Sequence, residues 1–222
     1  AVIEGESAPT IVLKNSIYLN VFTKTWETAN IWIYEDRIVY VGDQLPKQTE
    51  GTEVIDCTGQ YIVPGYIEPH AHPFHLYNPE SFAYHVAKFG TTTLISDNLR
   101  LLSLLEREEI FALIEDFHHL PVSMFWWGRY DAQTMLAREH EAFDTNNVLS
   151  WISHPSVVQG GELTSWPQLL EGDDRLLYWI QETKRLKKRV EGHLPGASEN
   201  TLTKLKLLGV SADHEAINGE EV

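Results

Sequence analysis

The feature that most constrains the fold of this chain is a regular alternation of strand and helix that begins near residue 61. Apolar runs rich in β-branched residues alternate with segments of helical character, so each later strand follows a helix rather than a hairpin turn. Strands connected in this way lie parallel in one sheet, because a crossover must return the chain to the same end. The six predicted strands cover residues 61–67, 91–96, 122–127, 157–163, 189–193 and 210–213.

The length of this region limits how many strand–helix units it can hold. An eight-unit (β/α) barrel takes about 250 residues, whereas only 162 residues follow residue 60. Six units fit and eight do not. The α/β pattern therefore predicts either a six-stranded open sheet or the first six strands of a longer TIM-like barrel. Helices are predicted at residues 79–89, 105–118, 131–143, 147–153, 173–189 and 198–209.

Residues 1–60 show a different pattern of short strands separated by polar turns, without helical segments between them. Runs of Ile, Val, Tyr and Trp bounded by turn residues are typical of a small antiparallel sheet. We therefore expect an N-terminal β portion at 1–60 and an α/β barrel portion at 61–222. The predicted β-strands cover residues 10–13, 16–20, 29–34, 37–42 and 53–56.

Charge and composition exclude several classes of partner. A formal net charge of −15 argues against nucleic acid and anionic membranes, because both must be neutralised by Lys and Arg. The single cysteine, Cys57, cannot form an intrachain disulfide, and we interpret it as a buried apolar side chain. No apolar run approaches the roughly 20 residues of a membrane helix, and residues 1–9 lack the regions of a signal peptide. We expect a cytoplasmic protein, and a homodimer is compatible with the apolar rim of a barrel.

The strongest chemical motif is His70-Ala71-His72, at the end of the first strand of the α/β region. Residues i and i+2 of a strand point to the same face, so His70 and His72 can bind one metal ion together. The alternative is a pair of surface histidines in a chain that has ten. Position favours the metal site, because active sites of such sheets lie at the carboxyl ends of the strands.

Three further candidate ligands stand at equivalent places on later strands: Glu162, His193 and His214. Each taken alone could be a polar residue at a strand end. Together with the first two histidines they form a set of one carboxylate and four imidazoles on one rim, which is typical of a transition-metal site.

Several motifs resemble those of a known family. Residues 61–72 resemble the opening motif of the amidohydrolase superfamily, in which a small β-sandwich precedes a metal-bearing (β/α)₈ barrel. Residues 191–196 (EGHLPG) and 211–215 (SADHE) resemble the strand-five and strand-six motifs of bacterial adenine deaminases. Gly161-Glu162-Leu163 matches the strand-four glutamate that takes the metal-bridging role of a carboxylated lysine elsewhere. The resemblance covers essentially the whole chain.

This resemblance implies a pair of divalent ions (Mn, Fe or Zn), with His70 and His72 on one, His193 and His214 on the other, and Glu162 bridging them as a catalytic residue. Such ions lower the pKa of bound water from 15.7 toward about 7. The resulting hydroxide attacks a purine base, and adenine yields hypoxanthine and ammonia.

Two departures from the family keep other functions open. Residues 73–78 (PFHLYN) replace the family's loop over the pocket, so a cyclic amide or an N-acyl compound is an alternative substrate. The family's strand-eight aspartate would lie beyond Val222, so we expect the segment to be inactive alone or part of a longer polypeptide. A non-catalytic metal-binding barrel fragment is a third interpretation.

Other residues are weaker candidates for contact with substrate. His75 follows the His-x-His motif closely, Glu215 adjoins His214, and Asp97 ends the second strand. The aromatic run 125–127 is predicted to be core, with one ring available to shape a pocket for a planar substrate.

Overall fold

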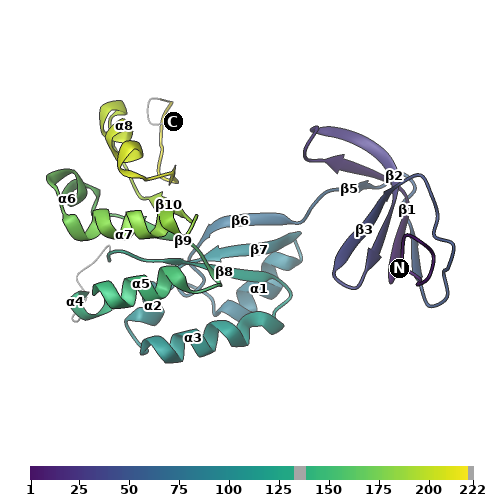
Figure 1. Cartoon of the computed structure of the whole chain (residues 1–222), viewed down its shortest axis with the longest axis horizontal. Coiled ribbons are helices and arrows are strands. Elements are labelled where there is room, and N and C mark those ends of the chain that lie inside the picture. The colour runs from purple at the N-terminus through teal and green to yellow at the C-terminus, as the bar shows by residue number, and fades with distance from the viewer. Residues whose placement is uncertain (133–138, 220–222) are drawn as a thin grey trace. The chain divides into compact units, whose positions relative to one another are not determined.

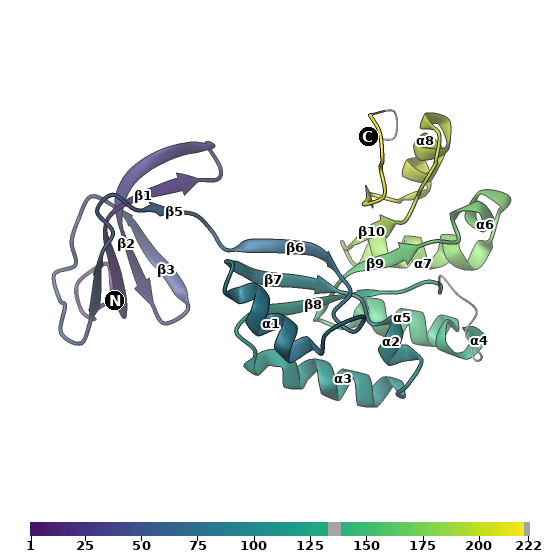
Figure 2. The same cartoon turned by 180° about the vertical axis from the view of Figure 1, so that it is seen from behind.

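The computed structural model describes residues 1–132 and 139–219 (Figures 1 and 2). The chain divides into two compact units, Ala1–Pro64 and Gly65–Val222. No helix among the described residues is both long and apolar enough to cross a membrane.

The N-terminal unit is one five-stranded sheet in which β3, β2, β1 and β4 are neighbours in that order and β5 also pairs with β1. The first three strands are antiparallel, but β4 and β5 run parallel to β1. The prediction of a purely antiparallel sheet was therefore wrong. A hairpin cannot produce this order; the connection 43–52 carries the chain from the β3 edge to the far side of β1. The strands are β1 (Ile11–Asn20), β2 (Thr25–Tyr34), β3 (Arg37–Gly42), β4 (Glu53–Asp56) and β5 (Tyr61–Ile62).

Strand β1 replaces the two strands predicted at 10–13 and 16–20. Its pairing with β2 shifts register between Leu13 and Ser16, and Asn15 at that bulge has φ +60°. Asn tolerates this left-handed conformation, and its backbone N–H donates to Asn30 Oδ1 at 3.0 Å. A bulge thus lets one strand continue where the sequence shows an interruption. Cys57 is buried in this unit, as predicted.

The second unit contains a parallel sheet of six strands in which every strand lies beside the next one in sequence. This singly wound order is that of a (β/α) barrel, and the sheet is a curled half-barrel whose crossover helices lie on its outer side (Figures 1 and 2). Of the two predicted alternatives, the structure therefore agrees with the first six strands of a longer TIM-like barrel and not with a six-stranded open sheet. The strands are β6 (Tyr66–Ala71), β7 (Thr91–Ser96), β8 (Ser123–Gly128), β9 (Val157–Leu163), β10 (Arg189–Gly192) and β11 (Ala212–Asp213).

The helices follow the predicted order with shifted bounds. The helix predicted to run to residue 189 ends at Arg185, because Lys187 adopts φ +59° before β10 begins. Residues 133–138 of the helix predicted at 131–143 lie outside the described residues, and α2 and α6 were not predicted. The helices are α1 (Pro79–Ala87), α2 (Leu99–Leu102), α3 (Arg107–Asp116), the 3₁₀ turn η1 (Phe117–His119), α4 (Glu139–Ala142), α5 (Thr145–Ser153), α6 (Trp166–Glu171), α7 (Asp174–Arg185) and α8 (Glu199–Leu208).

The core of the second unit lies between the sheet and these helices. Trp126 packs in a cluster with residues of α3 and α5, and a second cluster joins β9 and β10 to α7 and α8. Trp126 and Trp127 are both fully buried, which confirms that the aromatic run is largely core. This apolar layer supports the strands, so their carboxyl ends are held at fixed positions.

Candidate metal centre

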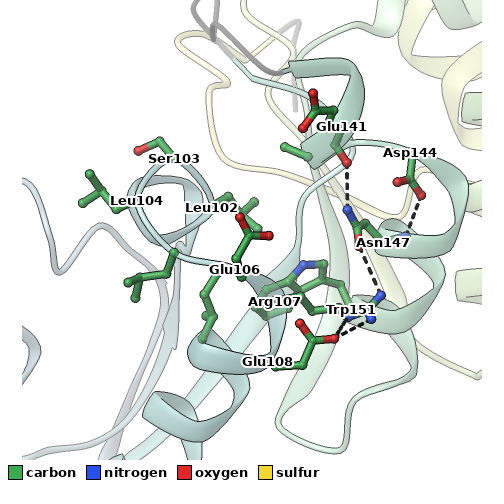
Figure 3. Close-up of a pocket in the computed structure, with 13 residues that line it drawn as sticks. Leu102, Ser103, Leu104, Glu106, Arg107, Glu108, Glu141, Asp144, Asn147 and Trp151 are labelled. Carbon is green, nitrogen blue, oxygen red and sulfur yellow. Dashed lines mark hydrogen bonds and ion pairs between the residues drawn. The ribbon is translucent and has the colours of Figure 1, made fainter.

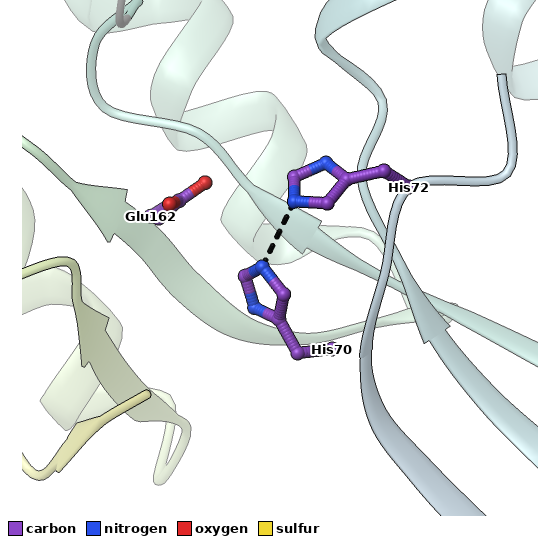
Figure 4. A group of neighbouring side chains, drawn as sticks. All are labelled: His70, His72 and Glu162. Carbon is purple, nitrogen blue, oxygen red and sulfur yellow. Dashed lines mark hydrogen bonds between the residues drawn. The ribbon is translucent and has the colours of Figure 1, made fainter. Parts of the chain in front are cut away.

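The His-x-His motif presents two imidazoles to the same side of β6. His70 lies within the strand and His72 directly follows it, with their Nε2 atoms 2.9 Å apart. Figure 4 shows both rings directed toward Glu162, which comes from β9. Donor atoms of the three residues lie within 4.8 Å of one another, so a single ion can contact all three.

A second group of three shares the same glutamate. Glu162 Oε1 lies 3.0 Å from His193 Nδ1 and 3.3 Å from His214 Nε2. These two ring nitrogens are themselves 3.2 Å apart. The five ligands expected from the sequence thus gather as two His–His–Glu groups around Glu162, whose side chain is 1% exposed.

The backbone before Glu162 requires glycine. Gly161 has φ +110°, and a Cβ there would lie 2.2 Å from the carbonyl oxygen of Glu191. Any larger residue would clash with β10 and adopt a strained conformation. Gly161 therefore allows β9 and β10 to approach closely where they carry Glu162 and His193.

Two buried carboxylates contact the outer nitrogens of the ligands. Asp97 Oδ2 lies 2.9 Å from His72 Nδ1, and Glu191 Oε1 lies 3.1 Å from His70 Nδ1. A carboxylate at Nδ1 fixes the tautomer and leaves Nε2 free to coordinate a metal. Asp97 was a weak sequence candidate, whereas Glu191 was noted only as part of the motif 191–196.

Arg129 links these groups and was missed from the sequence. Its Nε donates to Asp97 Oδ1 at 3.0 Å, and its NH2 donates to Glu162 Oε2 at 2.8 Å. The side chain is 1% exposed. Its place directly after β8, equivalent to that of other candidates, is the only signal the sequence offers.

These contacts keep the carboxylates ionised. Burial raises the pKa of Asp97, but its hydrogen bonds with His72 and Arg129 outweigh burial and hold it well below the usual range. Burial likewise opposes ionisation of Glu162, whose pKa is nevertheless lowered by His214 and Arg129. Burial alone would lower the pKa of His214, yet the hydrogen bond with Glu162 and the nearby Glu191 carboxylate raise it to about 10. The cluster therefore favours positive charge at its centre.

The donor set fits divalent transition metals. Each group offers two imidazole nitrogens and one carboxylate oxygen, a combination that Zn, Fe and Mn all accept. Three protein ligands leave coordination positions for water or substrate, as catalytic sites require.

The weaker candidates lie at the edge of this cluster. The exposed His75 ring stacks on His72 with centroids 4.8 Å apart, and Glu215 Oε1 lies 3.5 Å from His193 Nδ1. Trp127 stacks on His70 at 4.5 Å. Contact of these residues with substrate stays a prediction.

A separate cavity of about 670 Å³ lies where α2 and the start of α3 face α4 and α5 (Figure 3). None of the candidate metal ligands lines it. Arg107 at its wall already donates to Asn147 and Ser150, so this polar group is satisfied within the protein.

A curled parallel half-barrel with two His–His–Glu groups at the carboxyl ends of its strands is the architecture expected of part of a metal-dependent hydrolase. Residues 61–221 match the amidohydrolase family, and the chain belongs to that family.

Curated relatives match the chain along nearly its whole length. A protein of Oceanobacillus iheyensis named "Putative adenine deaminase" is 64% identical over 100% of this chain. A Bacillus subtilis protein with the same description is 50% identical over 100% of the chain, and the "Adenine deaminase" of Kosmotoga olearia is 30% identical over 99%. The chain spans 38% of the length of each of these relatives.

Solved structures share the fold at low sequence identity. The N-acyl-D-glutamate deacylase of Bordetella bronchiseptica has a TM-score of 0.65 at 12% identity, with 93% of this chain and 51% of that chain covered. The N-acetyl-D-glucosamine-6-phosphate deacetylase of Mycobacterium smegmatis has a TM-score of 0.56 at 14% identity, with 94% and 60% covered.

Proposed function

We propose that this chain supplies the metal-binding part of a hydrolytic deaminase that acts on a purine base, with adenine converted to hypoxanthine and ammonia. The observation that carries the proposal is the sharing of the buried Glu162 by two histidine pairs. The choice of adenine as substrate is supported by the names of relatives, one of which is a putative adenine deaminase that is 64% identical to this chain.

The proposed centre holds two divalent ions. His70 and His72 would bind one ion, His193 and His214 the other, and Glu162 both. Bound there, a divalent ion lowers the pKa of water from 15.7 toward about 7 and so supplies hydroxide at neutral pH.

The chain's own residues prepare the site for this chemistry. Arg129 and the imidazoles keep Glu162 ionised, so that it is a ligand rather than a neutral acid at pH 7. Asp97 forms a hydrogen bond with His72 Nδ1, and His72 Nε2 is left directed into the site. We propose that Glu215, which lies half-exposed beside His193, contacts a substrate nitrogen.

The loop 73–78 supports a second substrate class, a cyclic amide or an N-acyl compound. His75 from this loop stacks on the ligand His72, so the segment that departs from the family lies beside the proposed centre. A change of residues there alters the surface that substrate meets while leaving the ligands in place.

The reaction products separate these possibilities, because deamination of a purine releases ammonia, whereas hydrolysis of a cyclic amide or an N-acyl compound forms a new carboxylate without ammonia; both products are therefore measured. The full-length natural polypeptide that carries this chain is loaded with Mn²⁺, Fe²⁺ or Zn²⁺ and assayed with a panel of purines, cyclic amides and N-acyl amino acids. We expect ammonia from adenine, and none from the matched H193A variant. Silence on every purine with metal bound would contradict the deaminase, and turnover of an amide would establish the second class.

A further inference from the structure

Glu191 is a buried carboxylate that lies outside both proposed ligand groups. It stands on β10, two residues before His193, and is 6% exposed. Gln159 Nε2 donates to its Oε2, so one oxygen is occupied from the side of β9. A carboxylate buried this deeply requires further partners, and it finds them among the histidines.

The other oxygen of Glu191 faces one histidine from each ligand group. Oε1 lies 3.1 Å from His70 Nδ1 and 3.3 Å from His214 Nδ1. The centroids of the two rings lie 3.8 Å apart, and the ring planes are tilted by 32°. His70 lies in β6 and His214 directly follows β11, so residues from opposite edges of the described sheet face the same Glu191 oxygen.

The opposite ring nitrogens point into the two proposed half-sites. His70 Nε2 lies 2.9 Å from His72 Nε2, and His214 Nε2 lies 3.3 Å from Glu162 Oε1. A histidine whose Nδ1 faces a carboxylate presents Nε2 to a metal in a fixed orientation. Asp97 does this for His72, a ligand of one half-site.

We propose that Glu191 is a positioning residue shared by both half-sites, orienting His70 for one ion and His214 for the other. This inference rests on the proposed two-ion centre. Loss of its negative charge should weaken the binding of both ions, because His70 and His214 would both lose the carboxylate that faces Nδ1.

The test measures each half-site alone in the full-length natural polypeptide. H193A leaves the half-site of His70 and His72, and H72A leaves that of His193 and His214. The E191Q substitution is added to each background, and the Zn²⁺ dissociation constant is measured by competition with a chromophoric chelator. We expect binding to weaken by about 10–100-fold in both backgrounds.

A matched control replaces another buried carboxylate. Asp131 is also 6% exposed, but it accepts hydrogen bonds from Thr164 and Ser165, and no histidine of residues 1–132 and 139–219 forms a hydrogen bond or ion pair with it. D131N should leave Zn²⁺ affinity unchanged in both backgrounds. A loss equal to that of E191Q would overturn the inference, since any buried carboxylate would then serve.

The remaining outcomes are distinguishable. If E191Q weakens Zn²⁺ binding in one background only, or in neither, the proposal that both half-sites share Glu191 is overturned. If E191Q does not fold, the Q159L substitution takes its place, because it removes the hydrogen-bond donor to Glu191. Zn²⁺ affinity must then fall in both backgrounds, or the inference fails. The Co²⁺ absorption spectrum of E191Q should keep the band intensity of the unsubstituted protein. A changed intensity would indicate a change of coordination number, which would mean that Glu191 is itself a metal ligand. An unsubstituted protein that binds no Zn²⁺ would overturn the metal centre itself.

Discussion

Replacement of Arg129 by methionine should destabilise the metal-free protein severely. The guanidinium is 1% exposed and lies 3.0 Å from Asp97 and 2.8 Å from Glu162, whose side chains are 4% and 1% exposed. Without it, the buried Asp97 and Glu162 carboxylates both lose the guanidinium that stabilises their ionised form. Removal of one partner from a buried ion pair costs about 3–5 kcal/mol, and two such contacts are lost here. We therefore expect the free energy of unfolding to fall by about 3–5 kcal/mol.

The assay is urea unfolding of the full-length polypeptide with a chelator present. The matched control is R37M, which removes an arginine 3.4 Å from Asp36 with side chains 81% and 77% exposed. An exposed pair contributes about 0–1 kcal/mol, so R37M should unfold close to the unsubstituted protein. Added Zn²⁺ should restore part of the lost free energy of unfolding in R129M, because positive charge returns beside Glu162. Equal unfolding of R129M and R37M in chelator would contradict this prediction.

Three further predictions concern the same region. G161A should lower the unfolding midpoint and abolish activity, because its Cβ would lie 2.2 Å from Glu191 O at φ +110°; a variant with an unchanged midpoint would contradict the packing described. H193A should lose one ion and all ammonia release together, whereas metal analysis that still finds two ions would count against the shared centre. In chelator, the raised pKa of His214, about 10 against 6.5 for the free side chain, stabilises the protein fully below pH 6.5 and ceases to do so as the pH rises toward 10. Thermal midpoints should therefore fall over that window, and H214N should flatten the profile.

The convergence of the ligands could be predicted from the sequence because it follows from topology. Alternating strands and helices force a parallel sheet, and a parallel sheet gathers its strand ends on one rim. His70, Glu162 and His214 each end or adjoin such a strand, so their meeting required no knowledge of side-chain packing.

The contacts behind the ligands depend on packing and were not predictable in this way. Arg129 and Glu191 find their partners 33 and 121 residues away along the chain. Which face each side chain occupies depends on local register, and register shifts occur within both the β8–β9 and the β9–β10 pairings. No local motif reports such shifts.

The N-terminal sheet likewise combines features that the sequence predicts with strand pairings that it does not predict. The strand segments were recognisable from their residue types, but the parallel pairing of β4 with β1 depends on the path of the connection 43–52. The bulge at Asn15 likewise joins two predicted strands, because a polar residue in the left-handed region resembles a turn in sequence.

The proposed two-ion centre can be tested by anomalous X-ray diffraction from crystals of the Zn²⁺-loaded, full-length polypeptide. We expect two zinc peaks, each about 2.0–2.2 Å from a Glu162 oxygen. One peak should lie beside His70 and His72, and the other beside His193 and His214. A single peak, or zinc bound without Glu162, would contradict the shared two-ion centre.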